Sequence, residues 1–108
     1  IMSAVSFDEL NLLNSKLCRT LSEPKRIQIL YALQNKPHHV TALSSTLDTP
    51  QSTISRHLAI LRQCGLVTSE RQGASTIYRL QEPEIIDIID SIQELLKRTF
   101  TRQSKMLV

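Results

Sequence analysis

Residues 50–65, PQSTISRHLAILRQCG, decide the fold. Three apolar side chains in this stretch fall within about 60° of one another at helical spacing and predict a core-facing stripe: Ile54, Leu58 and Leu61. Thr49 is expected to cap the helix and Pro50 to occupy its first position, where the fixed φ of proline is favourable. Gly65 is the residue best suited to end the helix in the left-handed conformation. We therefore predict a helix over Pro50–Cys64.

The opposite face of this helix is small and polar around one arginine. It carries Ser52, Ser55, Arg56 and Ala59, with Gln51 and Thr53 near its N-terminal end. Such a face can enter a DNA major groove, since it has no bulky apolar group to block entry and no acid to repel phosphate. Arginine can bond guanine in a bidentate way, glutamine can bind adenine, and the helix N-terminus attracts phosphate. The alternative for such a face taken alone is a solvated helix surface.

The segments on either side complete a helix-turn-helix with a wing. Val40–Leu47 has apolar residues at one helical spacing and predicts a two-turn helix ahead of the turn. Leu66–Glu70 and Thr76–Leu80 are predicted strands, joined by a hairpin turn over residues 71–75 that contains one glycine. Between residues 49 and 80 one acid accompanies four arginines, Arg56, Arg62, Arg71 and Arg79. A basic hairpin directly after two short helices is typical of a winged helix-turn-helix that binds nucleic acid.

Three further helices are predicted outside this unit. The first covers Ser6–Thr20, the second runs from near Ser22 to Gln34, and the last runs from Glu82 to about Phe100. The fold class is therefore mainly α with a small β-hairpin wing, in the order helix-helix-helix-helix-hairpin-helix. The last helix has six or more large apolar residues on one face, more than so small a core can cover, which favours a homodimer. Packing on the first helix of the same chain is the alternative.

Composition limits the class of protein. We expect the 108 residues to form one domain, 1–108. With 41% hydrophobic residues, a net charge of +3 and no apolar run near the ~20 residues of a membrane span, we expect a cytoplasmic protein without a membrane partner. Two glycines are too few for a P-loop or a dinucleotide fingerprint. Neither a nucleophile–base pair nor a paired-carboxylate site is placed, so we expect no enzyme activity and no cofactor.

Four blocks of sequence, in order, resemble the ArsR/SmtB family of bacterial winged-helix repressors. These blocks are EPKRIQIL at 23–30, QSTISRHL at 51–58, LRQCGLV at 61–67, and the wing, SERQG at 69–73 followed by IYRL at 77–80. The resemblance implies a homodimer whose terminal helices, about 6–20 and 83–102, form the interface, and which releases operator DNA when an inducer binds. The DNA-binding positions that it implies are Gln51, Ser52, Thr53, Ser55 and Arg56 in the helix, with Arg71 and Gly73 in the wing.

A two-fold dimer would hold two recognition helices one DNA turn apart, roughly 34–36 Å, and would require a near-palindromic operator on double-stranded DNA. A winged helix used only for contacts between proteins is the alternative class. That alternative would favour acids or apolar side chains on the outward face of residues 50–64, where serines and one arginine are found.

The sequence departs from the metal sites of similar proteins. The Cys-x-Cys pair with which many members bind soft metals falls on His39 and Thr41, and threonine cannot replace a thiolate. The zinc site between last helices in other members uses Asp and His, and this last helix lacks histidine. His38 and His39 are adjacent and point different ways, so we expect them to be exposed loop residues. No metal site is predicted, and the inducer is left open.

The two cysteines offer one alternative for the inducer. The plain interpretation is that Cys18 and Cys64 are buried thiols that behave as small hydrophobic side chains. The functional hypothesis is a redox switch, in which oxidation or persulfidation of Cys64 shifts the DNA-recognition helix, residues 50–64, and Cys18 acts as the resolving thiol. The absence of a CxxC pattern favours a reducing compartment.

Overall fold

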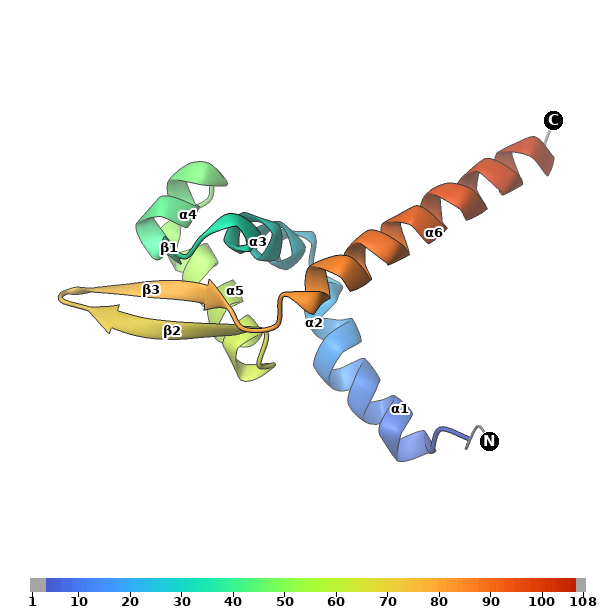
Figure 1. Ribbon diagram of the computed structural model, residues 1–108, viewed down its shortest axis with the longest axis horizontal. Coiled ribbons are helices and arrows are strands. Elements are labelled where there is room, and N and C mark those ends of the chain that lie inside the picture. Colours follow the sequence, from blue (N-terminus) through green and yellow to red (C-terminus); the bar gives the residue numbers. More distant parts are fainter. Residues whose placement is uncertain (1–3, 107–108) are drawn as a thin grey trace.

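The computed structural model describes residues 4–106. An N-terminal helical segment comprises α1 (Phe7–Leu13), a π-helical turn (Asn14–Cys18) and α2 (Arg19–Leu21). It is followed by α3 (Pro24–Asn35), α4 (Val40–Thr46), α5 (Gln51–Gln63) and, after the sheet, the long α6 (Glu84–Met106). The strands are β1 (His38–His39), β2 (Val67–Gln72) and β3 (Ser75–Leu80). Figure 1 shows the winged helix-turn-helix that the sequence predicts, mainly helical with a small β wing.

Local sequence explains where the helices begin and end. Ser6 and Glu9 form a reciprocal capping box at the start of α1, with the Glu9 N–H donating to the Ser6 hydroxyl at 3.1 Å. Gly65 follows α5 with φ +84°, so the predicted left-handed end of that helix is confirmed. The predicted cap of α5 is wrong by one residue. Pro50, not Thr49, precedes the first turn, and no side chain caps it.

The sheet contains one strand more than the predicted hairpin. Its order is β1-β3-β2, antiparallel throughout, with His38 opposite Tyr78 and His39 opposite Ile77. The prediction that these histidines lie in an exposed connection is wrong, because both are half-buried at the edge of the sheet. The hairpin turn is also tighter than the five residues expected: Gln72 pairs with Ser75, and Gly73 turns the chain with φ +63°.

The core lies where α3, α4 and α5 meet the base of the wing and the start of α6 (Figure 1). It consists of twelve buried apolar side chains: Ile29, Leu30, Leu33, Leu43, Ile54, Leu58, Leu61, Leu66, Val67, Ile85, Ile86 and Ile89. The predicted stripe of α5 is fully buried within it. The core therefore fixes which face of α5 points to solvent.

The terminal helices leave this body and diverge from each other like the arms of a V (Figure 1). The radius of gyration is 16.8 Å, against about 13 Å for a compact domain of this length. The accessible surface is 7937 Å², against about 6,100 Å² for a folded monomer of this mass. Within residues 4–106, no helix is both long and apolar enough to span a membrane.

Candidate nucleic-acid interface

A tight turn connects α4 to α5 and sets the angle between them. Asp48 occupies the left-handed region at φ +47°, a conformation that aspartate tolerates better than most residues with a side chain. The Thr49 N–H donates to the Ser44 carbonyl oxygen at 3.0 Å, and the Ser44 hydroxyl donates back to the Thr49 carbonyl oxygen. These bonds hold the N-terminal end of α5 against α4. The sequence analysis did not predict the left-handed conformation of Asp48, although aspartate is one of the residue types that adopt it.

The outward face of α5 carries the five predicted DNA-binding residues of this helix. Gln51, Ser52, Ser55 and Arg56 are exposed, and Thr53 is half-buried. The Arg56 Nη2 donates to the Thr53 hydroxyl at 3.4 Å, so the guanidinium is held along the helix surface toward the N-terminal end. The structure thus brings these residues together on one solvent-facing surface, whose chemistry suits base edges and phosphate oxygens.

The N-terminal end of α5 adds backbone donors to this surface. The Thr53 and Ile54 N–H groups both donate to the Pro50 carbonyl oxygen, at 3.1 Å each. The N–H groups of Gln51 and Ser52 precede the first intrahelical bond and receive no capping side chain. A helix end with free N–H groups and a positive dipole end is suited to a phosphate.

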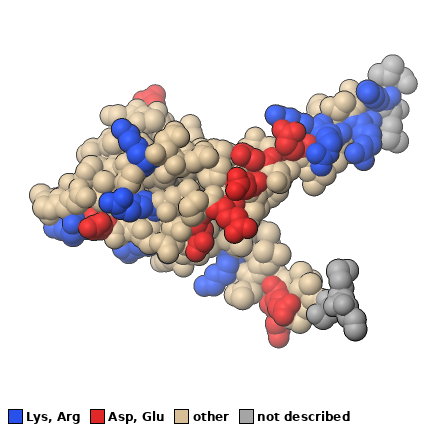
Figure 2. Space-filling model, viewed as in Figure 1, with Lys and Arg blue, Asp and Glu red and all other residues tan. Residues whose placement is uncertain are grey.

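The wing stands beside α5 and carries exposed basic side chains. Arg71 and Gly73 lie at its tip and are exposed, whereas Arg79 pairs with Glu70 across the two strands at 3.7 Å. Figure 2 shows basic side chains gathered at this end of the molecule. Because Arg79 has a local partner and Arg71 lies at the tip, Arg71 is the wing arginine best placed for phosphate.

Two arginines, Arg26 and Arg62, join α5 to its surroundings through bonds that the sequence did not predict. The Arg62 Nη1 donates to the Ser69 hydroxyl at 3.2 Å, which links the end of α5 to β2. The Arg26 Nε donates to His57 Nδ1 at 3.3 Å, and its Nη1 donates to the Thr20 carbonyl oxygen at 3.0 Å, which links α3 to α5 and α2. Burial and the nearby Arg26 guanidinium lower the pKa of His57. His57 accepts the Arg26 bond at Nδ1 and so helps to orient α5.

The two cysteines occupy different surroundings. Cys18 is exposed, so the expectation that it is a buried thiol is wrong. Cys64 is half-buried at the end of α5, and its Sγ donates to the Lys16 carbonyl oxygen at 3.2 Å. This bond ties the N-terminal helical segment to the recognition helix. Both thiols are free.

Metal ligands do not gather in the part of the chain that the structure describes. Over these residues, no group of three or more His, Cys, Asp and Glu side chains could hold a metal ion. His39 instead contacts the Thr76 carbonyl oxygen through Nδ1 at 3.3 Å, and so serves the pairing of β1 with β3.

The helix pair, the polar face of α5 and the basic wing define a winged helix-turn-helix protein. A family model described as "Bacterial regulatory protein, arsR family" matches residues 23–69. The chain belongs to this family of regulatory proteins.

Individual proteins agree with this assignment. The HTH-type transcriptional repressor SmtB of Mycobacterium tuberculosis is 38% identical over 68% of this chain, which spans only 55% of that relative. The transcriptional activator HlyU of Vibrio cholerae is 34% identical over 73% of either chain. The crystal structure of M. tuberculosis Rv0081 superposes with a TM-score of 0.75 at 29% identity, covering 87% of this chain and 95% of the other.

Proposed function

We propose that this chain is a homodimeric repressor that binds a near-palindromic operator and releases it when an inducer binds. Residues 1–108 act as one winged-helix unit, and its terminal helices, about 6–20 and 83–102, form the dimer interface. Gln51, Ser52, Thr53, Ser55 and Arg56 contact the DNA from α5, and Arg71 and Gly73 contact it from the wing.

The observation that carries the dimer is the large apolar surface on α1 and α6. The exposed fractions are 75% for Phe7, 56% for Ile92, 63% for Leu96 and 70% for Phe100. The protein exposes roughly 1,800 Å² more than a folded monomer of its mass is expected to expose. An excess of this size per chain is within the range that the interface of an obligate homodimer removes from each partner. A two-fold pairing of the terminal helices is the symmetric way to cover it.

The roles of the DNA-binding residues follow from their positions. Arg56 lies mid-face on α5 and is proposed to bond a guanine, while Gln51 and Ser52 present backbone N–H groups to a phosphate. Arg71 at the wing tip is proposed to contact a phosphate of the flanking DNA. Gly73 allows the turn that places the wing tip close to the backbone of the DNA.

The test is fluorescence anisotropy on double-stranded DNA from upstream of the protein's own gene, at several salt concentrations. We expect Arg56→Ala to weaken specific binding by roughly 1–3 kcal/mol and to relax base preference. Arg71→Ala should weaken binding to all sequences and reduce the salt slope. Lys36→Ala removes the same charge from the end of α3 and serves as the matched control. Unchanged operator affinity in Arg56→Ala would remove that residue from base recognition.

The sign of regulation needs its own measurement, because SmtB is named a repressor and HlyU an activator. Transcription from the operator-bearing promoter should fall when the purified protein is added, since a bound dimer occludes the DNA. A rise in transcript would replace the repressor with an activator and leave the DNA-binding proposal intact.

The observation that favours a thiol inducer is the Cys64 contact with the Lys16 carbonyl oxygen. Oxidation or persulfidation removes the S–H donor and so frees the N-terminal helical segment from the end of α5. Cys18 is the proposed resolving thiol. We expect oxidant-treated protein to lose operator affinity, and Cys64→Ser, whose hydroxyl keeps a donor, to resist the treatment. Equal loss of affinity in both proteins would exclude Cys64 as the sensor.

A further inference from the structure

A polar cavity lies beside the C-terminal end of α5, on the side that faces the N-terminal helical segment. Its volume is about 380 Å³. Three cationic side chains line it, Lys16 and Arg19 from the N-terminal segment and Arg26 from α3, and its lining contains no Asp or Glu. Neither of the ion pairs found among residues 4–106 involves any of the three. This space, here called the cationic cavity, therefore concentrates positive charge that no ion pair in the described part of the chain neutralises.

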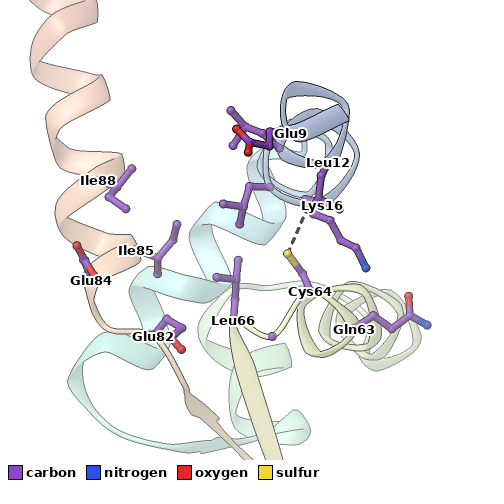
Figure 3. Close-up of a pocket in the computed structure, with 13 residues that line it drawn as sticks. Glu9, Leu12, Lys16, Gln63, Cys64, Leu66, Glu82, Glu84, Ile85 and Ile88 are labelled. Carbon is purple, nitrogen blue, oxygen red and sulfur yellow. Dashed lines mark hydrogen bonds between the residues drawn. The ribbon is translucent and has the colours of Figure 1, made fainter. Parts of the chain in front are cut away.

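The cationic cavity shares a wall with the larger cleft between α1 and α6. That cleft, of about 730 Å³, has a mostly apolar lining with three glutamates (Figure 3). Lys16 and Cys64 line both spaces, and the bond from Cys64 Sγ to the Lys16 carbonyl oxygen connects them. Figure 3 shows the Lys16 side chain turned away from Ile85 and Ile88 and toward the side of Gln63, which also lines the cationic cavity. The Lys16 ammonium therefore contributes its charge to the cationic cavity.

Arg26 has hydrogen-bond donors available at this cavity. A guanidinium carries five N–H groups. Nε donates to His57 Nδ1 at 3.3 Å, and Nη1 donates to the carbonyl oxygens of Arg19 at 3.3 Å and Thr20 at 3.0 Å. Nη2 donates to no protein atom among residues 4–106, and no fully buried side-chain nitrogen or oxygen in that range lacks a partner, so Nη2 reaches solvent. Its two N–H groups can therefore bind a solute in the cavity.

The donors around the cavity suit a phosphate dianion. Guanidinium groups bind phosphate oxygens through pairs of N–H bonds, and the lysine adds a third positive charge. The Ser15 hydroxyl and the Gln63 amide, which also line the cavity, can donate to further oxygens. A singly charged carboxylate would leave more of the positive charge without a counterion. The volume equals that of about a dozen water molecules at ~30 Å³ each, so a small organic group can accompany the phosphate.

We propose that the cationic cavity binds a small phosphate monoester, and that this ligand is an inducer that draws Arg26 away from His57. The inference rests on the operator-binding function proposed above and deepens it by naming the class of inducer. A phosphate held by Nη2 competes with His57 for the adjacent Nε donor. Because the same guanidinium links α3 to α5 and α2, its displacement loosens the support of α5. The Cys64 thiol lines the same cavity, so the thiol and the phosphate ester act on one junction.

The cationic cavity coincides with neither of the proposed macromolecular interfaces. Its lining residues are distinct from the exposed apolar side chains of α1 and α6 through which two copies are proposed to pair. It also lies at the opposite end of α5 from the free N–H groups of Gln51 and Ser52. We therefore expect the ligand to reach its site in the DNA-bound dimer.

Isothermal titration calorimetry on the whole chain tests the site directly. Inorganic phosphate should bind saturably, with half-saturation at about 1–10 mM, the range for a few solvent-exposed charged bonds. Glycerol phosphate should bind more tightly than inorganic phosphate, because its organic part fills more of the cavity, and glycerol alone should not bind. Sodium chloride holds the ionic strength constant throughout, because screening by itself weakens charged contacts.

Two substitutions remove charge from the cavity and keep its backbone bonds. Arg19→Gln and Lys16→Gln leave in place the carbonyl oxygens to which Arg26 and Cys64 donate. Each should raise the Kd for glycerol phosphate about tenfold, since each removes a charged hydrogen bond. Lys36→Gln removes one charge just after α3, outside the cavity, and should leave this Kd unchanged.

Fluorescence anisotropy on operator DNA tests the regulatory effect. At constant ionic strength, saturating glycerol phosphate should weaken operator binding by the wild-type protein about fivefold or more. The same concentration should have a smaller effect on Arg19→Gln and on Lys16→Gln. Without glycerol phosphate, both variants should bind the operator as wild type does.

The outcomes separate the inference from the function on which it rests. A wild-type protein that binds both phosphate probes but not the operator would refute the proposed function and leave the anion site standing. Absence of saturable binding, or equal Kd values for wild type and the two cavity variants, would overturn the anion site, and equal affinity for inorganic phosphate and glycerol phosphate would overturn the monoester. Unchanged operator affinity at saturation would overturn the role as inducer. Loss of operator affinity in the variants without ligand would show that these cations contact DNA, and would also overturn the inference.

Discussion

Truncation to alanine at two apolar residues of α6 should affect two different quantities, the Kd of the dimer and the stability of the single chain. Leu96 has 63% of its surface exposed in the single chain, whereas Ile89, two turns closer to the body, has 4% exposed. Ile89 contributes to the core of one chain, and Leu96 contributes only where a second chain covers it. Leu96→Ala should therefore weaken the dimer and spare the fold, and Ile89→Ala should destabilise the fold.

The magnitude for Leu96 follows from its exposed fraction. Full burial of a leucine side chain stabilises by about 1.5–3 kcal/mol. Covering the 63% that one chain leaves exposed gives about 1–2 kcal/mol per copy, and two copies meet in each dimer. The dimer should thus lose about 2–4 kcal/mol, which raises its Kd roughly 30- to 1,000-fold. Ile89→Ala should instead lower the free energy of unfolding of the chain by about 2–5 kcal/mol.

Two measurements distinguish these effects. Sedimentation equilibrium gives the dimer Kd, and urea unfolding at concentrations well below that Kd gives the stability of the single chain without the contribution of association. The reasoning fails if Leu96→Ala dimerises as tightly as wild type. It also fails if this variant, studied as a monomer, loses as much stability as Ile89→Ala.

Further predictions concern single residues of the body. Gly65→Ala should lower the free energy of unfolding by about 1–2 kcal/mol. The cost comes from the backbone, since φ is +84°, and not from a clash, since nothing lies within 4 Å of an added Cβ. Gly65→Asn should lower it less, and urea unfolding that gives the alanine variant the stability of wild type would contradict this. The pKa of His57 is lowered in the fold, so the unfolded chain binds more protons and the free energy of unfolding should fall as the pH drops below about 6.5. Urea unfolding at pH 7.5 and 5.5 should show a weaker pH dependence of stability for His57→Gln than for wild type. The same pH dependence in both proteins would show that His57 is not the cause. The pKa of Tyr31 is raised by its hydrogen bond to Asp90, then by burial and by the charge of Asp90. In a Tyr78→Phe background, which leaves Tyr31 as the one tyrosine, the phenolate absorbance should therefore appear above pH 10, and Asp90→Asn should lower the midpoint of this titration. An unchanged midpoint would show that Asp90 is not the cause.

Periodicity was sufficient to predict most of the fold. The stripe of α5, the left-handed Gly65 and the two wing strands follow from local patterns of apolar residues and from glycine, and each is found in the structure. The strand at His38–His39 could not be predicted in this way. It is two residues long, follows Pro37, and exists only because β3 pairs with it from nearly forty residues further along the chain.

The candidate site, like the fold, could be predicted from the sequence only in part. The outward face of α5 was predictable because the core-facing stripe determines which residues point away from it. The partners of Arg26 and Arg62 were not, since both bonds join elements that are separate in sequence, and a basic residue has no periodic signal. The cap of α5 was misassigned because a threonine before a proline fits the usual cap pattern, whereas here the Thr49 hydroxyl donates to the Leu47 carbonyl oxygen within the turn.

The position of α5 is coupled to both arms of the V by specific bonds. Cys64 connects the end of α5 to the N-terminal helical segment through the Lys16 carbonyl oxygen. On the other side, the Tyr31 hydroxyl on α3 donates to Asp90 and accepts from the Gln93 amide at 2.9 Å, which fixes α6 to the helix that carries Arg26 and, through it, His57.

A near-palindromic operator requires two recognition helices at one fixed separation, about one DNA turn. Because the arms that would pair two chains are bonded to the elements that hold α5, a change in how the arms pair must alter that separation. In the proposed dimer, an inducer therefore need not unfold or touch α5 to release DNA. It needs to bind one arrangement of the arms more tightly than another, and the shift in DNA affinity is limited by that difference in binding.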